Sequence, residues 1–154
     1  MYDQLIRPIA DRAVTLLADD FKLKIKSREF EITHPEQIEL RSCTSMIGLG
    51  GSFSVMFVMS FDNDALESLT RSFSHAPIAD NEMEEMKRSA SCEIANVIIG
   101  NALENFPNRG SVVTITPPIS VEHATTITKN ESSKISSVTI ESLRGYITVS
   151  IIGA

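Results

Sequence analysis

The chain has 154 residues, 42% of them hydrophobic, and a formal net charge of −6. This size and composition fit a single globular domain over residues 1–154 with one buried core. Nucleic acids and anionic membranes are poor partners for it, because both are bound by basic patches and its lysines and arginines are scattered. Charged residues interrupt the first twenty positions and no later run is long enough to span a membrane, so we expect a cytoplasmic protein.

The first half of the chain predicts one helix followed by three strands. Apolar residues at helical spacing predict a helix over 4–19, and alternating apolar residues predict strands over 22–32 and 37–47. The glycines of 48–51 predict a hairpin turn, and large apolar residues at every second position predict a strand over 53–61. We expect these three strands to form an antiparallel meander.

The second half predicts two helices followed by four strands. Asp64-Ala65-Leu66-Glu67 and Asn81-Glu82-Met83-Glu84 resemble capping boxes, which predict helices over 64–73 and 81–106. The rest of the chain is rich in Val, Ile and Thr, and the strands expected there lie near 111–116, 118–128, 134–142 and 145–152. This order of elements is typical of an α+β fold with an antiparallel or mixed sheet.

The longer of the two helices carries a polar stripe on an otherwise apolar surface. At about 100° per residue, Ser89, Glu93, Asn96 and Gly100 fall within an arc of roughly 60°. Burying an acid and an amide costs several kcal/mol unless each finds a partner. Either Glu93 pairs internally, with Arg88 or another cation, while Asn96 bonds nearby backbone, or the stripe meets another molecule. Gly100 favours the second alternative, because glycine inside a helix costs ~1 kcal/mol against alanine and is usually kept for close approach.

Other residues that often carry chemistry do not form a site in this sequence. His34, His75 and His123 lie far apart and lack the spacing of metal ligands, so we expect no metal site. Cys43 and Cys92 do not make a disulfide framework, and reduced thiols are expected. No histidine lies close to Cys92 in the sequence, which disfavours a thiol nucleophile.

The stripe resembles the signature of a known family. Ser89-x-x-x-Glu93-x-x-Asn96 followed by Pro118 is similar to the [Asp/Ser]-x-x-x-Glu-x-x-Asn…Pro pattern of the CheC/CheX/FliY family of chemotaxis phosphatases. The order of elements is similar over nearly the whole chain. With one copy of the motif and no flagellar-switch domain, the chain resembles the CheX members most. The resemblance implies a CheC-like or CheX-like α+β fold, in which the sheet packs against a long central helix and an N-terminal helix.

The chemistry of aspartyl-phosphate hydrolysis suggests a role for each member of the motif. Its loose transition state mainly requires an in-line water, which a neutral carboxamide can hold without repelling the phosphoryl group. We therefore assign the attacking water to Asn96. Glu93 is better used to pair with a cation, which the resemblance implies is the active-site lysine of a phosphorylated CheY-like response regulator. Ser89, Gly100 and Pro118 are assigned to partner binding or to structure.

The resemblance further implies that the response regulator brings both the phospho-Asp and Mg²⁺, so that the chain needs no cofactor of its own. It also implies a homodimer, which an open edge along residues 147–151 would favour. Two alternatives stay open. The chain is a non-catalytic module that docks a receiver domain or flagellar component through the same stripe, or it is an unrelated α+β scaffold in which Glu93 and Asn96 are satisfied internally.

Overall fold

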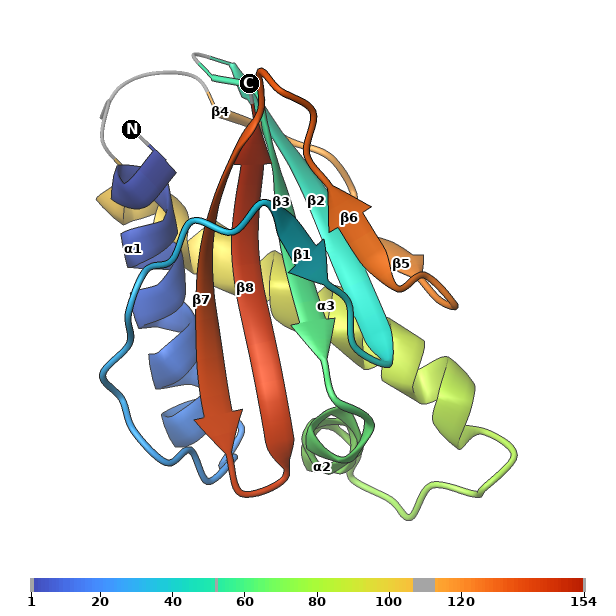
Figure 1. Cartoon of the computed structure of the whole chain (residues 1–154). Helices are drawn as coiled ribbons and strands as arrows, with labels where there is room; N and C mark the ends of the chain where they lie inside the picture. The colour runs from blue at the N-terminus through green and yellow to red at the C-terminus, as the bar shows by residue number, and fades with distance from the viewer. Residues whose placement is uncertain (1, 52, 107–112, 154) are drawn as a thin grey trace.

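Three helices cover one face of an antiparallel sheet (Figure 1). The structure is a computed structural model that describes residues 2–51, 53–106 and 113–153. A π-helical turn over Leu16–Asp20 continues the first helix, and a 3₁₀ turn over Leu103–Asn105 continues the third. The helices are α1 (Tyr2–Thr15), α2 (Asn63–Phe73) and α3 (Met83–Ala102). None of them is both long and apolar enough to cross a membrane.

The main sheet has the strand order β4-β2-β3-β8-β7, and β5 pairs with β2 further along the same edge. All of its pairings are antiparallel. Its strands are β2 (Cys43–Gly51), β3 (Val55–Phe61), β4 (Val113–Ile115), β5 (Ile119–Val121), β7 (Lys134–Ser142) and β8 (Gly145–Gly153). A separate two-stranded sheet joins β1 (Gln37–Glu39) to β6 (Thr126–Thr128). The predicted α+β class with an antiparallel sheet is confirmed.

The core lies between the main sheet and the helices. Alternate residues of β3 point toward the helices, and Phe57, Met59 and Phe61 are fully buried there. Ile94 and Ile98 of α3 join the same cluster, so α3 packs on the sheet through one side. A smaller apolar cluster on the opposite face holds the two-stranded sheet in place and is built around Ile38, Val58 and Ile135.

The segment 22–32, predicted as a strand, is not one. It runs beside β7 but touches it through isolated bridges rather than a continuous ladder. The Glu29 N–H donates to Ser27 Oγ over 3.1 Å, and this local turn directs the backbone away from regular pairing. The expected three-stranded meander is therefore reduced to the β2–β3 hairpin.

Two other predicted strands are each divided between the two sheets. The segment predicted as one strand over 37–47 forms two strands, β1 and β2. Between them the Arg41 N–H donates to the Ser60 side-chain Oγ over 2.7 Å, and this bond interrupts the strand. The prediction over 118–128 becomes β5 and β6, separated by His123, whose φ of 61° is in the left-handed region. The chain thus passes from the small sheet to the main one between β1 and β2, and from the main sheet to the small one between β5 and β6.

The glycines of 48–51 do not form the predicted turn, because β2 continues through Gly51. Gly48 and Gly50 instead lie where the sheet is tightly covered. A Cβ on Gly48 would lie 3.1 Å from Thr116 Cγ2, and one on Gly50 would lie 2.8 Å from Thr114 Oγ1. These glycines therefore serve close side-chain packing inside a strand.

The predicted capping boxes are also wrong. α2 begins after Asp62 and α3 after Glu82, and neither residue makes a side-chain capping hydrogen bond. The Asp62 carboxylate is used elsewhere, because it accepts a hydrogen bond of 2.7 Å from the Tyr146 N–H. α3 ends at Ala102, four residues before the predicted end at residue 106.

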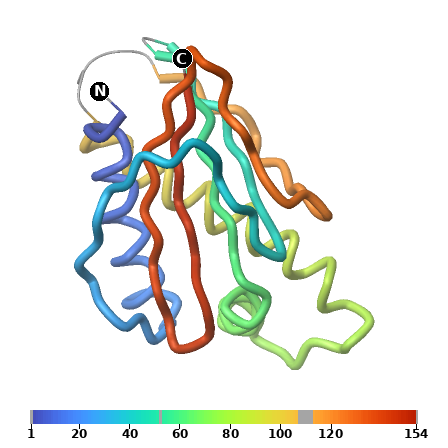
Figure 2. Tube along the Cα trace, viewed as in Figure 1, coloured from blue at the N-terminus to red at the C-terminus, as the bar shows by residue number. Residues whose placement is uncertain are grey.

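The edge expected along 147–151 is not open. These residues belong to β8, which is hydrogen-bonded to β3 on one side and to β7 on the other. The sheet instead ends at β7 on one side and at β4 and β5 on the other. Figure 2 shows that the chain starts and finishes at the same end of the molecule, where the Tyr2 hydroxyl lies close to Gly153.

Candidate functional site

The polar stripe lies on the outer side of α3, which crosses behind the main sheet in Figure 1. Ser89, Glu93, Asn96 and Gly100 are all exposed, as their spacing predicts. The opposite side of the helix is buried, and Ile94, Ala95, Ile98, Ile99 and Ala102 have no exposed surface. Because packing fixes the rotation of α3, the stripe is held outward.

Small residues bring α3 close to β2 and fix its position there. Ala90, Ser91 and Ala95 are buried on the side of α3 that packs against the sheet. Ser45 of β2 reaches across and donates a hydrogen bond of 3.1 Å from Oγ to the Ser91 carbonyl. Ser91 Oγ in turn donates to the Arg88 carbonyl over 2.8 Å. These bonds join the buried side of the helix to a central strand, so the stripe rests on a rigid support.

The side chains of Glu93 and Asn96 make no hydrogen bond or ion pair within residues 2–51, 53–106 and 113–153. Arg88, which the sequence suggested as a partner of Glu93, is already paired with another residue. Its Nη1 lies 3.1 Å from Glu122 Oε1. This hydrogen bond to Glu122 raises the pKa of the Arg88 guanidinium above its usual range. The alternative in which Glu93 and Asn96 are satisfied internally is therefore wrong.

Gly100 and Pro118 differ in their surroundings. A Cβ placed on Gly100 would meet no atom of the described structure within 4 Å, so packing inside the chain does not explain a glycine there. Pro118 is half-buried and comes directly before β5, a strand that contacts α3. The structure thus places four of the five predicted site residues on one helix face and Pro118 at the strand beside it.

The cysteines lie on the buried flank of the site. Cys43 Sγ donates to Ser91 Oγ over 3.6 Å, and Cys92 is half-buried. Burial raises the pKa of the Cys92 thiol above its usual value, which keeps it protonated and a poor nucleophile near neutral pH. In the described part of the chain, no three His, Cys, Asp or Glu side chains gather as metal ligands.

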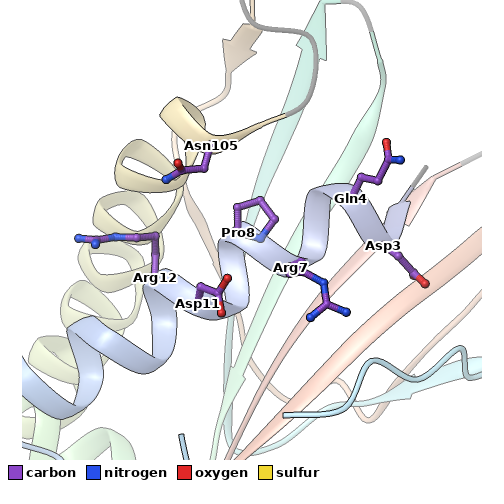
Figure 3. A pocket seen from close by; sticks show the side chains of 7 residues that line it. All are labelled: Asp3, Gln4, Arg7, Pro8, Asp11, Arg12 and Asn105. Carbon is purple, nitrogen blue, oxygen red and sulfur yellow. The ribbon is translucent and has the colours of Figure 1, made fainter. Parts of the chain in front are cut away.

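Sequence patterns did not identify Arg12 as a neighbour of the site. Figure 3 shows its side chain extending from α1 toward α3, and Arg12 Nη2 lies 3.5 Å from Asn101 Oδ1. Asn101 directly follows Gly100 on α3 and donates from Nδ2 to the Val97 carbonyl over 2.8 Å. Arg12 and Asn101 are 89 positions apart in the sequence, so helical periodicity could not predict their contact.

Comparisons with known proteins identify the family and the fold. A sequence model of the family described as chemotaxis phosphatase CheX matches residues 43–141. CheX from Desulfovibrio desulfuricans shares the fold with a TM-score of 0.78 at 14% identity, over 96% of this chain and 97% of that chain. A CheC-like superfamily protein from Shewanella sp. PV-4 gives 0.79 at 15% identity, over 100% of both chains.

The fold is also shared with a chain of the CheX–CheY–BeF₃–Mg²⁺ complex from Borrelia burgdorferi. The TM-score is 0.70 at 21% identity, over 97% of this chain and 96% of that chain. No curated protein matches the sequence. At these identities the solved structures establish the fold, and the matched sequence family covers more than half of the chain.

Proposed function

The chain belongs to the CheX family of chemotaxis phosphatases, and we propose that it hydrolyses the aspartyl phosphate of a CheY-like response regulator in chemotaxis signalling. One observation carries this proposal: Glu93 and Asn96 stand one turn apart on the exposed side of α3, with no partner inside the described chain. The CheX–CheY–BeF₃–Mg²⁺ complex of the Borrelia relative supports a receiver domain as the partner.

In the proposed reaction, α3 lies against the receiver and inserts two side chains with different tasks. Asn96 Oδ1 accepts a hydrogen bond from the attacking water while Nδ2 donates toward a phosphoryl oxygen, which places the water in line without adding negative charge. Glu93 pairs with the receiver's active-site lysine and thereby sets the depth and direction of insertion. Breaking the P–O bond to the aspartate needs little acid or base catalysis, because the transition state is loose.

The receiver supplies Mg²⁺ together with the phospho-Asp, so this chain contributes positioning rather than a metal ion. Ser89, Gly100 and Pro118 form the surface on which the receiver rests. Gly100 suits this task, because the missing side chain leaves the helix backbone open to close approach. We further propose that the protein works as a homodimer, as its resemblance to CheX implies.

A phosphate-release assay tests this function. A CheY-type receiver is phosphorylated with a small phosphodonor, freed of the donor, and followed with and without catalytic amounts of the protein. We expect release to accelerate at least tenfold and to show turnover when the receiver is in excess. Binding of the receiver without any acceleration would instead identify a non-catalytic docking module, and neither binding nor acceleration would contradict both functions.

A further inference from the structure

Ser91 is a buried polar residue on the side of α3 that faces away from the stripe. It has no exposed surface, and Ile94 and Ala95 on the same side of the helix are apolar. Ser91 lies about 160° around the helix and about 3 Å along its axis from Glu93, and about 140° and 7.5 Å from Asn96. The contact that Ser91 makes with the sheet is therefore almost directly across the helix from the two proposed functional side chains.

A hydrogen bond joins the main sheet to the backbone of α3 at Ser91. Ser45 of β2, which is also fully buried, donates from Oγ to the Ser91 carbonyl over 3.1 Å. Cys43, two residues earlier on the same strand, donates from Sγ to Ser91 Oγ over 3.6 Å, and a thiol is a weaker donor than a hydroxyl. The Ser91 carbonyl is part of the helix backbone, and only the χ1 torsion separates the Ser45 hydroxyl from its strand. This bond therefore leaves the helix little freedom relative to β2.

Other contacts of α3 restrain its rotation less strictly. Apolar packing against the sheet is non-directional, so it favours burial of one side of the helix without selecting an exact angle. Arg88 pairs with Glu122, just after β5, through side chains that are 41% and 34% exposed. Lys87 reaches Asn63 of α2 through a long side chain with several rotatable bonds. The bond from Ser45 to the Ser91 carbonyl is therefore the contact that fixes the angle of α3 on the sheet most directly.

The proposed reaction is sensitive to this angle. A side-chain atom about 6 Å from the helix axis moves by about 1 Å when the helix turns by about 10°. A misplacement of about 1 Å can cost up to about a hundredfold in the rate of a reaction that depends on positioning. Receiver binding is spread over a larger surface and tolerates such a shift better. A small rotation of α3 is therefore expected to lower the rate of hydrolysis more than the affinity.

We infer that Ser45 is a positioning residue for the proposed reaction: its hydrogen bond to the Ser91 carbonyl sets the angle of α3 and thereby the place where Asn96 holds the attacking water. The inference rests on the proposed function, since it takes the role of Asn96 from it. A buried polar contact can select one arrangement among several apolar packings of similar free energy. Ser45 lies beneath the helix with no exposed surface, so it acts on the reaction without touching the receiver.

The test separates rate from affinity in Ser45 variants. The kcat is measured with a saturating phosphorylated CheY-type receiver, and the Kd is measured with the same receiver activated by BeF₃⁻ and Mg²⁺. We expect Ser45→Ala to lower kcat about tenfold while the Kd stays within twofold of the wild type. Ser45→Cys keeps a weaker donor at the same position, so we expect an intermediate kcat. This second variant also keeps the test informative if Ser45→Ala does not fold.

Thr44→Val is the matched control, because it removes a buried hydroxyl from the neighbouring position of the same strand. Thr44 is 1% exposed and points to the opposite face of the sheet, where its Oγ1 lies 2.8 Å from Ser60 Oγ. We expect this control to be less stable than the wild type but to keep its kcat within twofold.

The inference is overturned if the folded Ser45 variants keep kcat within twofold of the wild type. It is also overturned if Thr44→Val lowers kcat as much as Ser45→Ala does, since general destabilisation would then explain both. A wild-type protein that does not accelerate dephosphorylation at all would contradict the proposed function itself, and this inference with it.

Discussion

Glu93 and Asn96 remain available because they lie on the side of α3 that does not pack against the sheet. Ile94 and Ile98 face the core, and Arg88 is held by Glu122 at the strand side. Glu93 and Asn96 face solvent, so their side chains stay hydrated until another molecule binds and supplies hydrogen-bond partners. At this scale the proposed chemistry depends on side chains that the fold leaves without internal partners.

Gly100 provides a test in which stability and binding change in opposite directions. We expect Gly100→Ala to raise the free energy of unfolding by about 0.5–1 kcal/mol, because alanine favours the helix and its methyl group meets no atom within 4 Å. The same methyl group stands where the receiver approaches, so affinity for the activated receiver should fall. Denaturant unfolding and a binding titration measure the two effects.

Gly50→Ala is the contrasting control, since its Cβ would lie 2.8 Å from Thr114 Oγ1 and should destabilise the protein. A destabilised Gly100→Ala variant, or one that binds the receiver as tightly as the wild type, would show that Gly100 is not kept open for a partner.

At the scale of elements, α2 and α3 are joined by a buried cation. The Lys87 side chain is only 6% exposed, and its Nζ donates to Asn63 Oδ1 in the first turn of α2 and lies 3.2 Å from Glu84 Oε1. Lys87 lies about 160° from Ser89 around α3, so this junction holds the helix from the side opposite the stripe. The junction therefore sets the position of α3 without contacting a bound receiver.

The hydrogen bond from Lys87 to Asn63 predicts that replacing Asn63 destabilises the protein more than replacing Lys87 does. Asn63→Ala should lower the free energy of unfolding by about 1–3 kcal/mol, because the buried ammonium loses an acceptor. Lys87→Met should cost less than ~1 kcal/mol, since an apolar side chain of similar length needs no acceptor. In the Lys87→Met background, Asn63→Ala should then have little effect. Denaturant unfolding of the three variants checks this, and an Asn63→Ala variant as stable as the wild type would refute the role of the bond.

The sequence predicted those elements whose pattern is local. The helix that became α3 and the β7–β8 hairpin were recognised because periodicity alone specifies them. Gly48 and Gly50 were misread as a turn, because their function depends on Thr116 and Thr114 far along the chain. For the same reason the stripe, which lies on one helix, could be predicted from its spacing, whereas Arg12 could not.

At the scale of the whole molecule, Asp3 links the first helix to the far edge of the sheet. Its Oδ1 accepts hydrogen bonds from Ser136 of β7 and from His34 in the intervening segment, and these bonds lower the pKa of the carboxyl. A pKa that is lower in the folded protein than in the unfolded chain stabilises the fold above about pH 4, and this contribution is lost as the pH falls through the folded value.

We therefore expect Asp3→Asn to reduce the loss of stability on acidification. The effect should stay below about 1 kcal/mol, because the Asp3 side chain is half exposed and solvent screens the interaction. Unfolding free energies measured from pH 2 to pH 7 test this, with Asp11→Asn as a control on the same helix. An unchanged pH profile in Asp3→Asn would contradict the link.

The proposed homodimer requires a contact other than the one the sequence suggested. β8 is enclosed by β3 and β7, so pairing through residues 147–151 is unavailable to a second copy. The sheet ends at β7 on one side and at β4 and β5 on the other, and we place the contact at the second edge, where Ile119 is 56% exposed. We expect sedimentation at micromolar concentration to give a dimer and Ile119→Lys to shift it toward monomer. A monomeric wild type at that concentration would contradict the proposal.

In the proposed mechanism, Asn96 places the water that attacks the phosphoryl group. The most direct measurement compares wild type and Asn96→Ala for the rate of receiver dephosphorylation and, in parallel, for affinity toward the BeF₃⁻-activated receiver. We expect the stimulated rate to fall about 100-fold, which corresponds to losing about 3 kcal/mol of transition-state stabilisation, while affinity changes by less than a few-fold. A rate within twofold of the wild type would remove Asn96 from the mechanism.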